Sequence, residues 1–199
     1  MLSLERVYQA AHLLKDVIRE TDMIPATNIK TDCELFLKTE NLQNTGSFKL
    51  RGAYFEMSQM SPEDRAKGVV ACSAGNHAQG VGFAARALGI KATIFLPSTA
   101  PISKVEATRR YGADIRLVDG VYDDAFNEAV AYQQETGAAF VHPFNDEDVI
   151  AGQGTIGLEI LKQLPHMDAV VVPIGGGGLI SGIAYVIKKL KPDCKVYGV

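Results

Sequence analysis

Hydrophobic and polar residues alternate along most of this chain in two distinct patterns. From about residue 33 onward, short apolar runs are separated by longer stretches in which apolar residues recur at helical spacing, and Gly or Pro stands at most junctions. The short runs predict strands at 33–38, 68–72, 92–96, 113–118, 138–141, 168–173 and 195–199. The longer stretches predict helices at 48–60, 75–88, 101–111, 122–136, 147–164 and 178–190. This order predicts an α/β fold of mainly parallel sheets with helices on both faces, because nearly continuous apolar strands must be buried on both sides.

The end of the chain departs from what a complete domain usually shows. Its last residues, VYGV, resemble a core strand, whereas a terminus normally lies in a helix, a loop or an edge strand. We therefore expect the C-terminal part of the fold to be missing from this polypeptide. No repeat, low-complexity tract or Ser/Pro-rich linker marks a domain boundary.

Composition narrows the classes of function. With 47% hydrophobic residues and a net charge of −3 over 199 residues, the chain has the content of a globular protein and no basic stripe for a nucleic acid. No stretch is long and apolar enough for a membrane span or a signal peptide, so we expect a cytoplasmic protein. Cys33, Cys72 and Cys194 are widely spaced, which favours reduced thiols in strands over a disulfide frame or a metal site. We expect no metal.

The first candidate for chemistry is Lys49, in the motif NTGSFKLRGA. Ser47 is predicted to be the N-cap of the helix, which places Lys49 in its first turn. There the positive end of the helix dipole favours the neutral amine, and a neutral amine is what Schiff-base chemistry requires. The alternative for Lys49 taken alone is an ordinary solvated lysine near a helix start.

The second candidate is the motif Ser73-Ala74-Gly75-Asn76-His77, between a predicted strand and a predicted helix. This arrangement offers free backbone N–H groups to an anion, and a substrate carboxylate would fit. The alternative is an ordinary Ser or Asn helix cap. Taken alone, His77 is expected to be a residue next to a helix cap or a core histidine with its hydrogen bonds satisfied. We give its side chain no role in proton transfer.

The third candidate is the run of four glycines, Gly175 to Gly178, again between a strand and a helix. Four consecutive glycines cost much backbone entropy, so we expect the close approach of a phosphate to require them. A permissive turn would need only one or two glycines. The loop lacks the spacing of a dinucleotide fingerprint and of a P-loop. An imine-forming lysine, a carboxylate loop and a monophosphate loop together describe a site for pyridoxal 5'-phosphate.

The motifs TGSFKLRGA, SAGNHAQGV and PIGGGGLISG resemble those of the fold-type II pyridoxal-phosphate enzymes, the group that includes the tryptophan synthase β subunit. PSTAPISKVEATRRYGA and AGQGTIGLEI fit the same group, and within it the sequence is most similar to the threonine dehydratases. The resemblance implies two domains: a small one at 46–143, and an incomplete large one made of 1–45 and 144–199.

The resemblance also implies a role for each motif residue. Lys49 would form the Schiff base with the cofactor and act as the catalytic base. The other cofactor-binding residues would be Phe48, Asn76, Gly175, Gly176, Gly177, Gly178 and Leu179. The substrate carboxylate would be held by Ser73, Ala74, Gly75 and His77. The serine racemases have serine where this chain has Ala74, so the resemblance favours elimination over racemisation.

The activity that follows from this resemblance is dehydration and deamination of L-threonine, and of L-serine, to a 2-oxo acid and ammonia. Such an enzyme would serve isoleucine biosynthesis or threonine catabolism, with an amino acid as its small-molecule partner and a homo-oligomer as its assembly. Three alternatives stay open: a serine racemase, a β-replacement enzyme that adds a nucleophile, and a non-catalytic N-terminal fragment. The last of these is motivated by the terminal strand, because an unpaired sheet edge invites another chain.

Overall fold

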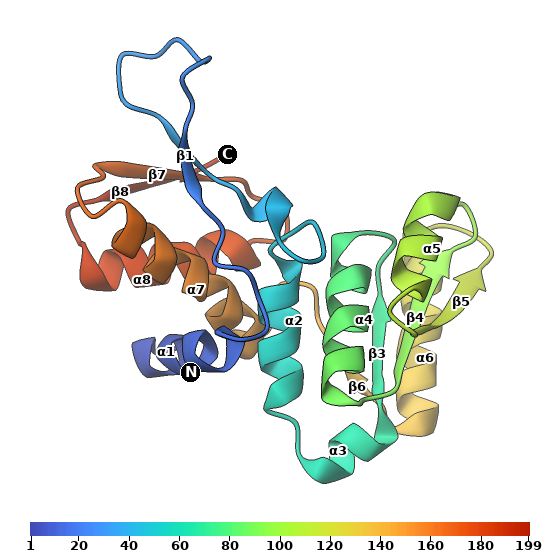
Figure 1. Ribbon diagram of the computed structural model, residues 1–199. Coiled ribbons are helices and arrows are strands. Elements are labelled where there is room, and N and C mark those ends of the chain that lie inside the picture. Colours follow the sequence, from blue (N-terminus) through green and yellow to red (C-terminus); the bar gives the residue numbers. More distant parts are fainter.

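The computed structural model describes residues 1–199 as helices around three small sheets (Figure 1). The helices are α1 Leu4–Leu14, α2 Lys49–Ser58, α3 Pro62–Lys67, α4 Asn76–Leu88, α5 Ile102–Arg109, α6 Tyr122–Thr136, α7 Glu147–Gln163 and α8 Gly178–Leu190, with a 3-10 helix at Glu40–Leu42. The strands are β1 Met23–Pro25, β2 Phe36–Lys38, β3 Val69–Cys72, β4 Ala92–Pro97, β5 Asp114–Val118, β6 Ala139–Phe140, β7 Ala169–Val172 and β8 Lys195–Gly198.

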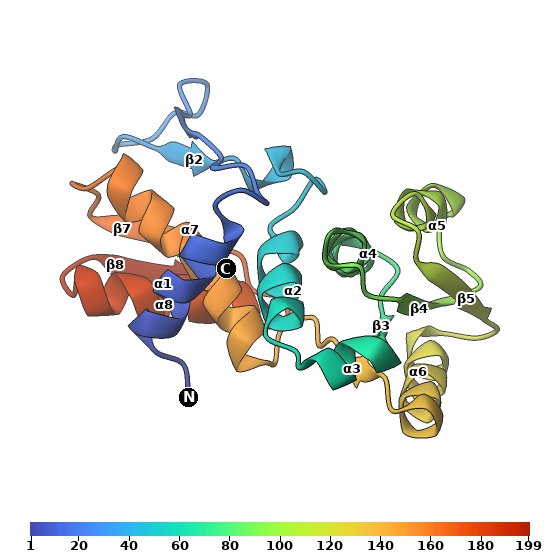
Figure 2. The same ribbon diagram turned by 60° about the horizontal axis from the view of Figure 1, so that its bottom comes forward.

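The largest sheet has the strand order β5-β4-β3-β6, and all of its strands are parallel. Figure 2 shows α4 and α5 on one face of this sheet and α6 on the other. Alternate side chains of β3 point to opposite faces of the sheet. Val69 and Ala71 pack against α4, and Val70 and Cys72 pack against α6. The expectation of parallel strands with helices on both faces is confirmed here, and β3 and β4 are buried as expected, whereas the edge strand β5 is partly exposed along its length.

The second packed region joins α7 and α8 to the parallel pair β7–β8. Val170, Val172 and Val196 face the two helices, while Val171 and its register partner Tyr197 are 60% and 50% exposed. Burial on both faces was therefore wrong for these strands, because the helices of this region cover only one face of the pair.

Helix α2 lies between these two regions, in contact with α4 on one side and with α7 on the other (Figure 1). A Cβ atom added at Gly80 of α4 would lie 3.0 Å from the Leu50 nitrogen, and one added at Gly152 of α7 would lie 2.6 Å from the Arg51 carbonyl oxygen. Both contacts are with backbone, so only glycine allows α4 and α7 to approach α2 this closely. Lys49 begins the helix that is clamped between them.

Three local predictions need correction. The strand expected at 33–38 is shorter, Phe36–Lys38, and it pairs antiparallel with β1, which the sequence pattern did not reveal. Helices α1 and α3 were not predicted. Of the three cysteines, all free, only Cys72 lies in a strand; Cys33 and Cys194 precede strands in irregular segments. No helix has the length and apolarity that crossing a membrane requires.

Candidate active site

Lys49 is the first residue of α2 and so lies in its first turn, as predicted, and the residue is half-buried. Its Nζ donates a hydrogen bond to the carbonyl oxygen of Pro143 at 2.5 Å and lies 5.4 Å from the centre of the Phe48 ring. No carboxylate pairs with it. Burial lowers the pKa of Lys49, since desolvation disfavours the charged form. The side chain therefore has the environment of a reactive amine and not of a solvated lysine.

The prediction that Ser47 caps α2 is wrong. The N-cap residue is Phe48, whose φ of −66° and ψ of −16° are already helical, and no side chain accepts a hydrogen bond from the first turn. The chain enters α2 through Gly46 at a φ of +73°. Ser47 is buried, and its Oγ has no hydrogen-bond partner.

The Ser73–His77 loop leads into the first residues of α4, and no side chain caps this helix. Gly75 is the N-cap residue, and the Ser73 hydroxyl accepts its hydrogen bond from the Gly75 nitrogen at 3.2 Å, within the loop. The side chain of Asn76, the first residue of the helix, is exposed. The Ser or Asn cap considered as an alternative is therefore not formed, and the helix N-terminus retains backbone donors that can bind an anion.

His77 is a satisfied core histidine. It is 4% exposed, and its Nε2 donates to the carbonyl oxygen of Val141 at 2.9 Å. Burial lowers its pKa to about 4, and the nearby charge of Lys49 acts in the same direction. Because the ring is engaged with Val141, only the backbone of His77 is left for a ligand of the loop.

The four-glycine loop runs from the end of β7 to the start of α8, and its glycines have different surroundings. A Cβ atom at Gly176 would lie 2.1 Å from the Phe144 ring, and one at Gly178 would lie 2.9 Å from the Phe144 carbonyl oxygen. Gly177 is the N-cap residue of α8 at a φ of +89°. Cβ positions at Gly175 and Gly177 are open, with nothing within 4 Å. Close packing requires glycine at Gly176 and Gly178, and the left-handed conformation favours it at Gly177, whereas the packing of the chain itself does not require it at Gly175.

The segment Val141–Asn145, which we call the strap, connects all three motifs. Its carbonyl groups accept from His77 and Lys49, and Phe144 packs against Gly176 and Gly178. The sequence reading missed this segment because its contacts are made mostly by backbone and one aromatic ring. Its position after β6, at the same edge of the parallel sheet as the loop after β3, was the available signal.

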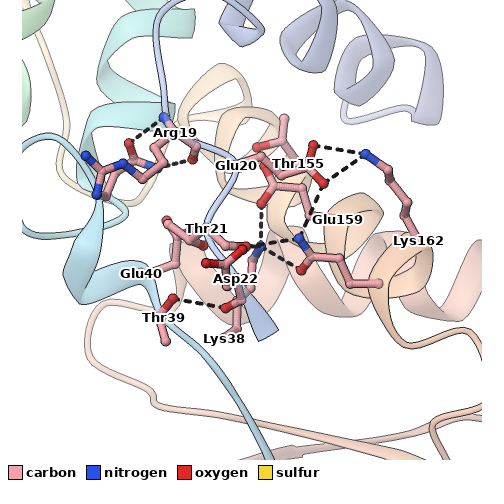
Figure 3. A network of polar contacts seen from close by, with 12 residues as sticks. Arg19, Glu20, Thr21, Asp22, Lys38, Thr39, Glu40, Thr155, Glu159 and Lys162 are labelled. Carbon is pink, nitrogen blue, oxygen red and sulfur yellow. Dashed lines mark hydrogen bonds and ion pairs between the residues drawn. The ribbon is translucent and has the colours of Figure 1, made fainter. Parts of the chain in front are cut away.

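Arg51, two residues after Lys49, is fully buried in a network of paired charges. Its guanidinium contacts the carboxylates of Glu40 and Glu159 at 2.7 and 2.5 Å. Glu159 also accepts from Lys38 at 2.5 Å, and Figure 3 shows Lys38, Thr21, Glu40 and Glu159 gathered beside α7. The network ties the first turn of α2 to α7 and to the N-terminal segment, so it orients the helix that carries Lys49.

Comparison with known proteins agrees with this arrangement. Residues 14–199 match the family model described as pyridoxal-phosphate dependent enzyme. The chain is 52% identical to an L-threonine ammonia-lyase of Thermotoga maritima, with 100% of this chain and 50% of that protein covered. Among solved structures, maize serine racemase matches 99% of the chain and 60% of its own length at 38% identity, with a TM-score of 0.95. The processed threonine deaminase isoform 2 of Solanum lycopersicum matches 98% and 56% at 39% identity, with a TM-score of 0.92.

The chain spans about half the length of the curated relatives it matches first, including a second L-threonine ammonia-lyase from Geobacter sulfurreducens. All of the motifs described above lie within the matched residues.

Proposed function

The chain belongs to the family of pyridoxal-phosphate dependent enzymes, and we propose that it acts in the dehydration and deamination of L-threonine, and of L-serine, to a 2-oxo acid and ammonia. The observation that carries the proposal is the half-buried Lys49 amine, which has a lowered pKa and donates a hydrogen bond to the strap that also contacts the four-glycine loop. The names of two relatives, both L-threonine ammonia-lyases, at 52% and 47% identity, support threonine as the substrate.

The residues present fit the cofactor that the family uses. The open Cβ positions at Gly175 and Gly177 leave the backbone of the loop accessible, and α8 begins directly behind it, as a phosphate site requires. In the proposed site this loop, with Leu179, holds the phosphate. Lys49 would hold the cofactor covalently, Phe48 would lie beside its ring, and Asn76 would hydrogen-bond its ring hydroxyl.

Pyridoxal phosphate, when bound, supplies an electron sink for negative charge at the Cα atom of an amino acid. The backbone of the Ser73–His77 loop holds the substrate carboxylate at the start of α4 and so orients the Cα–H bond. Lys49, once its amine is free, takes the Cα proton on Nζ, and burial, which lowers its pKa, favours the neutral amine that this step needs. The β-hydroxyl then leaves as water with the proton that Nζ returns, and hydrolysis of the dehydrated product gives the 2-oxo acid and ammonia.

Ala74 supports elimination over racemisation. A racemase needs a second proton donor on the face opposite Lys49, and an alanine side chain has no proton to give. The similarity to maize serine racemase keeps racemisation as the second candidate. A β-replacement activity is the third, since it would share every residue named above. The fourth is a non-catalytic fragment, which would retain the motifs without turnover.

We also propose the assembly that surrounds this site. Residues 46–143 would form a small domain that moves against a large domain containing 1–45 and 144–199, and closure between them would keep water from the reacting atoms. A cytoplasmic homo-oligomer without metal, nucleic-acid or membrane partners completes the proposal.

A product assay separates these activities. The protein, supplied with pyridoxal phosphate and L-threonine or L-serine without added thiol, is expected to release ammonia and 2-oxo acid in equal amounts. D-serine as the main product would favour a racemase, and turnover only in the presence of a thiol would favour β-replacement. Cofactor binding without any product would favour the non-catalytic fragment.

A further inference from the structure

The strap Val141–Asn145 is itself held in place by one of its own side chains. The Nδ1 atom of His142 accepts hydrogen bonds from the backbone nitrogens of Phe144 and Asn145, at 3.2 and 2.8 Å. The His142 ring also meets the Phe144 ring edge to face, with centroids 4.7 Å apart and planes at 88°. These contacts close a tight turn around Pro143, the residue whose carbonyl oxygen accepts from Lys49.

An Nδ1 that accepts two hydrogen bonds carries no proton, so the neutral ring has its proton on Nε2. The surroundings favour this neutral form. Burial lowers the pKa of His142, and the charge of Lys49 lowers it further, against the opposing effect of Asp146. The ring of His77, also close, is neutral for the same reasons. The acceptor state of His142 is thus the stable one at neutral pH.

The turn determines where two parts of the proposed site lie. It presents the Pro143 carbonyl oxygen to Lys49, and it sets the Phe144 ring against Gly176 and its backbone against Gly178. A rotation of the 143–145 backbone would therefore move the partner of the amine and the packing surface of the glycine loop together. The structure provides no other side-chain hydrogen bond to the backbone nitrogens of this turn.

We propose that His142 is a positioning residue, whose Nδ1 acceptor fixes the turn that aligns Lys49 with the phosphate loop. The inference rests on the proposed function, since it assumes that Lys49 and the glycine loop hold one cofactor. It assigns His142 no contact with the reacting atoms. The acceptor on Nδ1, and not the aromatic ring as such, is what the site requires.

Two substitutions separate the acceptor from the ring. His142→Asn places an amide oxygen close to the position of Nδ1 and keeps the acceptor, whereas His142→Phe keeps an aromatic ring and removes it. His166→Phe, at an exposed histidine outside the site, is the matched control. If His142→Phe does not fold, His142→Gln replaces it, because its longer amide reaches toward the Nε2 position instead.

Two measurements other than turnover test the proposal. Hydrogen exchange of a peptide containing Phe144 and Asn145 reports the two backbone bonds, and titration with pyridoxal phosphate, followed by absorbance, reports cofactor affinity. We expect His142→Phe to lose protection at these amides and to bind the cofactor about tenfold more weakly, since two hydrogen bonds are lost. His142→Asn and His166→Phe should stay within about twofold of the unmodified protein.

Equal cofactor affinity in His142→Phe and the unmodified protein would overturn the inference, even if thermal stability fell. So would equal losses in His142→Phe and His142→Asn, because the acceptor would then not be the cause. Failure of the proposed function is recognised separately: it would leave the unmodified protein without a cofactor adduct on Lys49. With that adduct present, the His142 comparison tests the positioning role alone.

Discussion

At the scale of single residues, burial sets the chemistry of this molecule more than pairing does. Lys49 has a carbonyl partner and no carboxylate, and its pKa is lowered by desolvation. His77 is held neutral in the core. The sequence indicated Lys49 through its motif and His77 as a core residue. It could not predict that Ser47 leaves α2 uncapped, because a serine before a helix is a preferred cap.

Glu56 on α2 tests whether burial shifts the pKa of a side chain, because such a shift makes the stability of the protein depend on pH. Its Oε2 is buried without a partner, and burial, with the charges of Asp146 and Asp148, raises its pKa to about 9. The folded protein therefore binds a proton that the unfolded chain, with its ordinary pKa, releases. The free energy of unfolding is therefore highest below about pH 4.5, where Glu56 is protonated in both states. It falls as pH rises from 4.5 toward 9, because the unfolded chain releases the proton first.

Glu56→Gln should remove that loss, because a neutral amide of the same shape cannot ionise. We expect the variant to be more stable than the unmodified protein at pH 8 by about 2 to 4 kcal/mol, and close to it at pH 4. Urea unfolding at the two pH values measures the difference. A Glu56→Gln effect that is the same at pH 4 and pH 8 would mean that the Glu56 carboxyl is ionised in the folded protein.

At the scale of elements, the long periodic segments were predictable and their mutual packing was not. The six predicted helices are all present, since each has enough turns to show a helical period. The short β1, and its antiparallel pairing with β2, left no such signal. The segment AGQGTIG was predicted as helix, but nothing local reveals that Gly152 and Gly154 allow α7 to approach α2 and α8 closely.

Gly152→Ala tests the role of that crossing. The added Cβ would lie 2.6 Å from both the Arg51 carbonyl oxygen and the Gly52 Cα, so α2 and α7 must separate. We expect a loss of about 1 to 3 kcal/mol in the free energy of unfolding, as for other overpacked cores. Gly175→Ala, where the added atom meets nothing within 4 Å, is the control and should change stability little. Equal stabilities of the two variants would show that the crossing adapts without cost.

At the scale of the whole molecule, three motifs far apart in the sequence meet through a fourth segment. The helix bearing Lys49 is clamped between α4 and α7, and the strap joins it to the loops before α4 and α8. The sequence predicted the three motifs because each has a recognisable pattern of residue types. It did not predict the strap, since backbone carbonyl groups and one phenylalanine ring make its contacts and only its position after β6 indicated it.

The central claim is that Lys49 is the amine that holds pyridoxal phosphate. Its most direct test is to mix the protein with pyridoxal phosphate, reduce with borohydride, digest, and locate the modified lysine by mass spectrometry. We predict stoichiometric modification of Lys49, with none in Lys49→Ala and no comparable labelling of Lys38, a buried lysine paired with Glu159. Labelling spread over surface lysines, or undiminished in Lys49→Ala, would contradict the account.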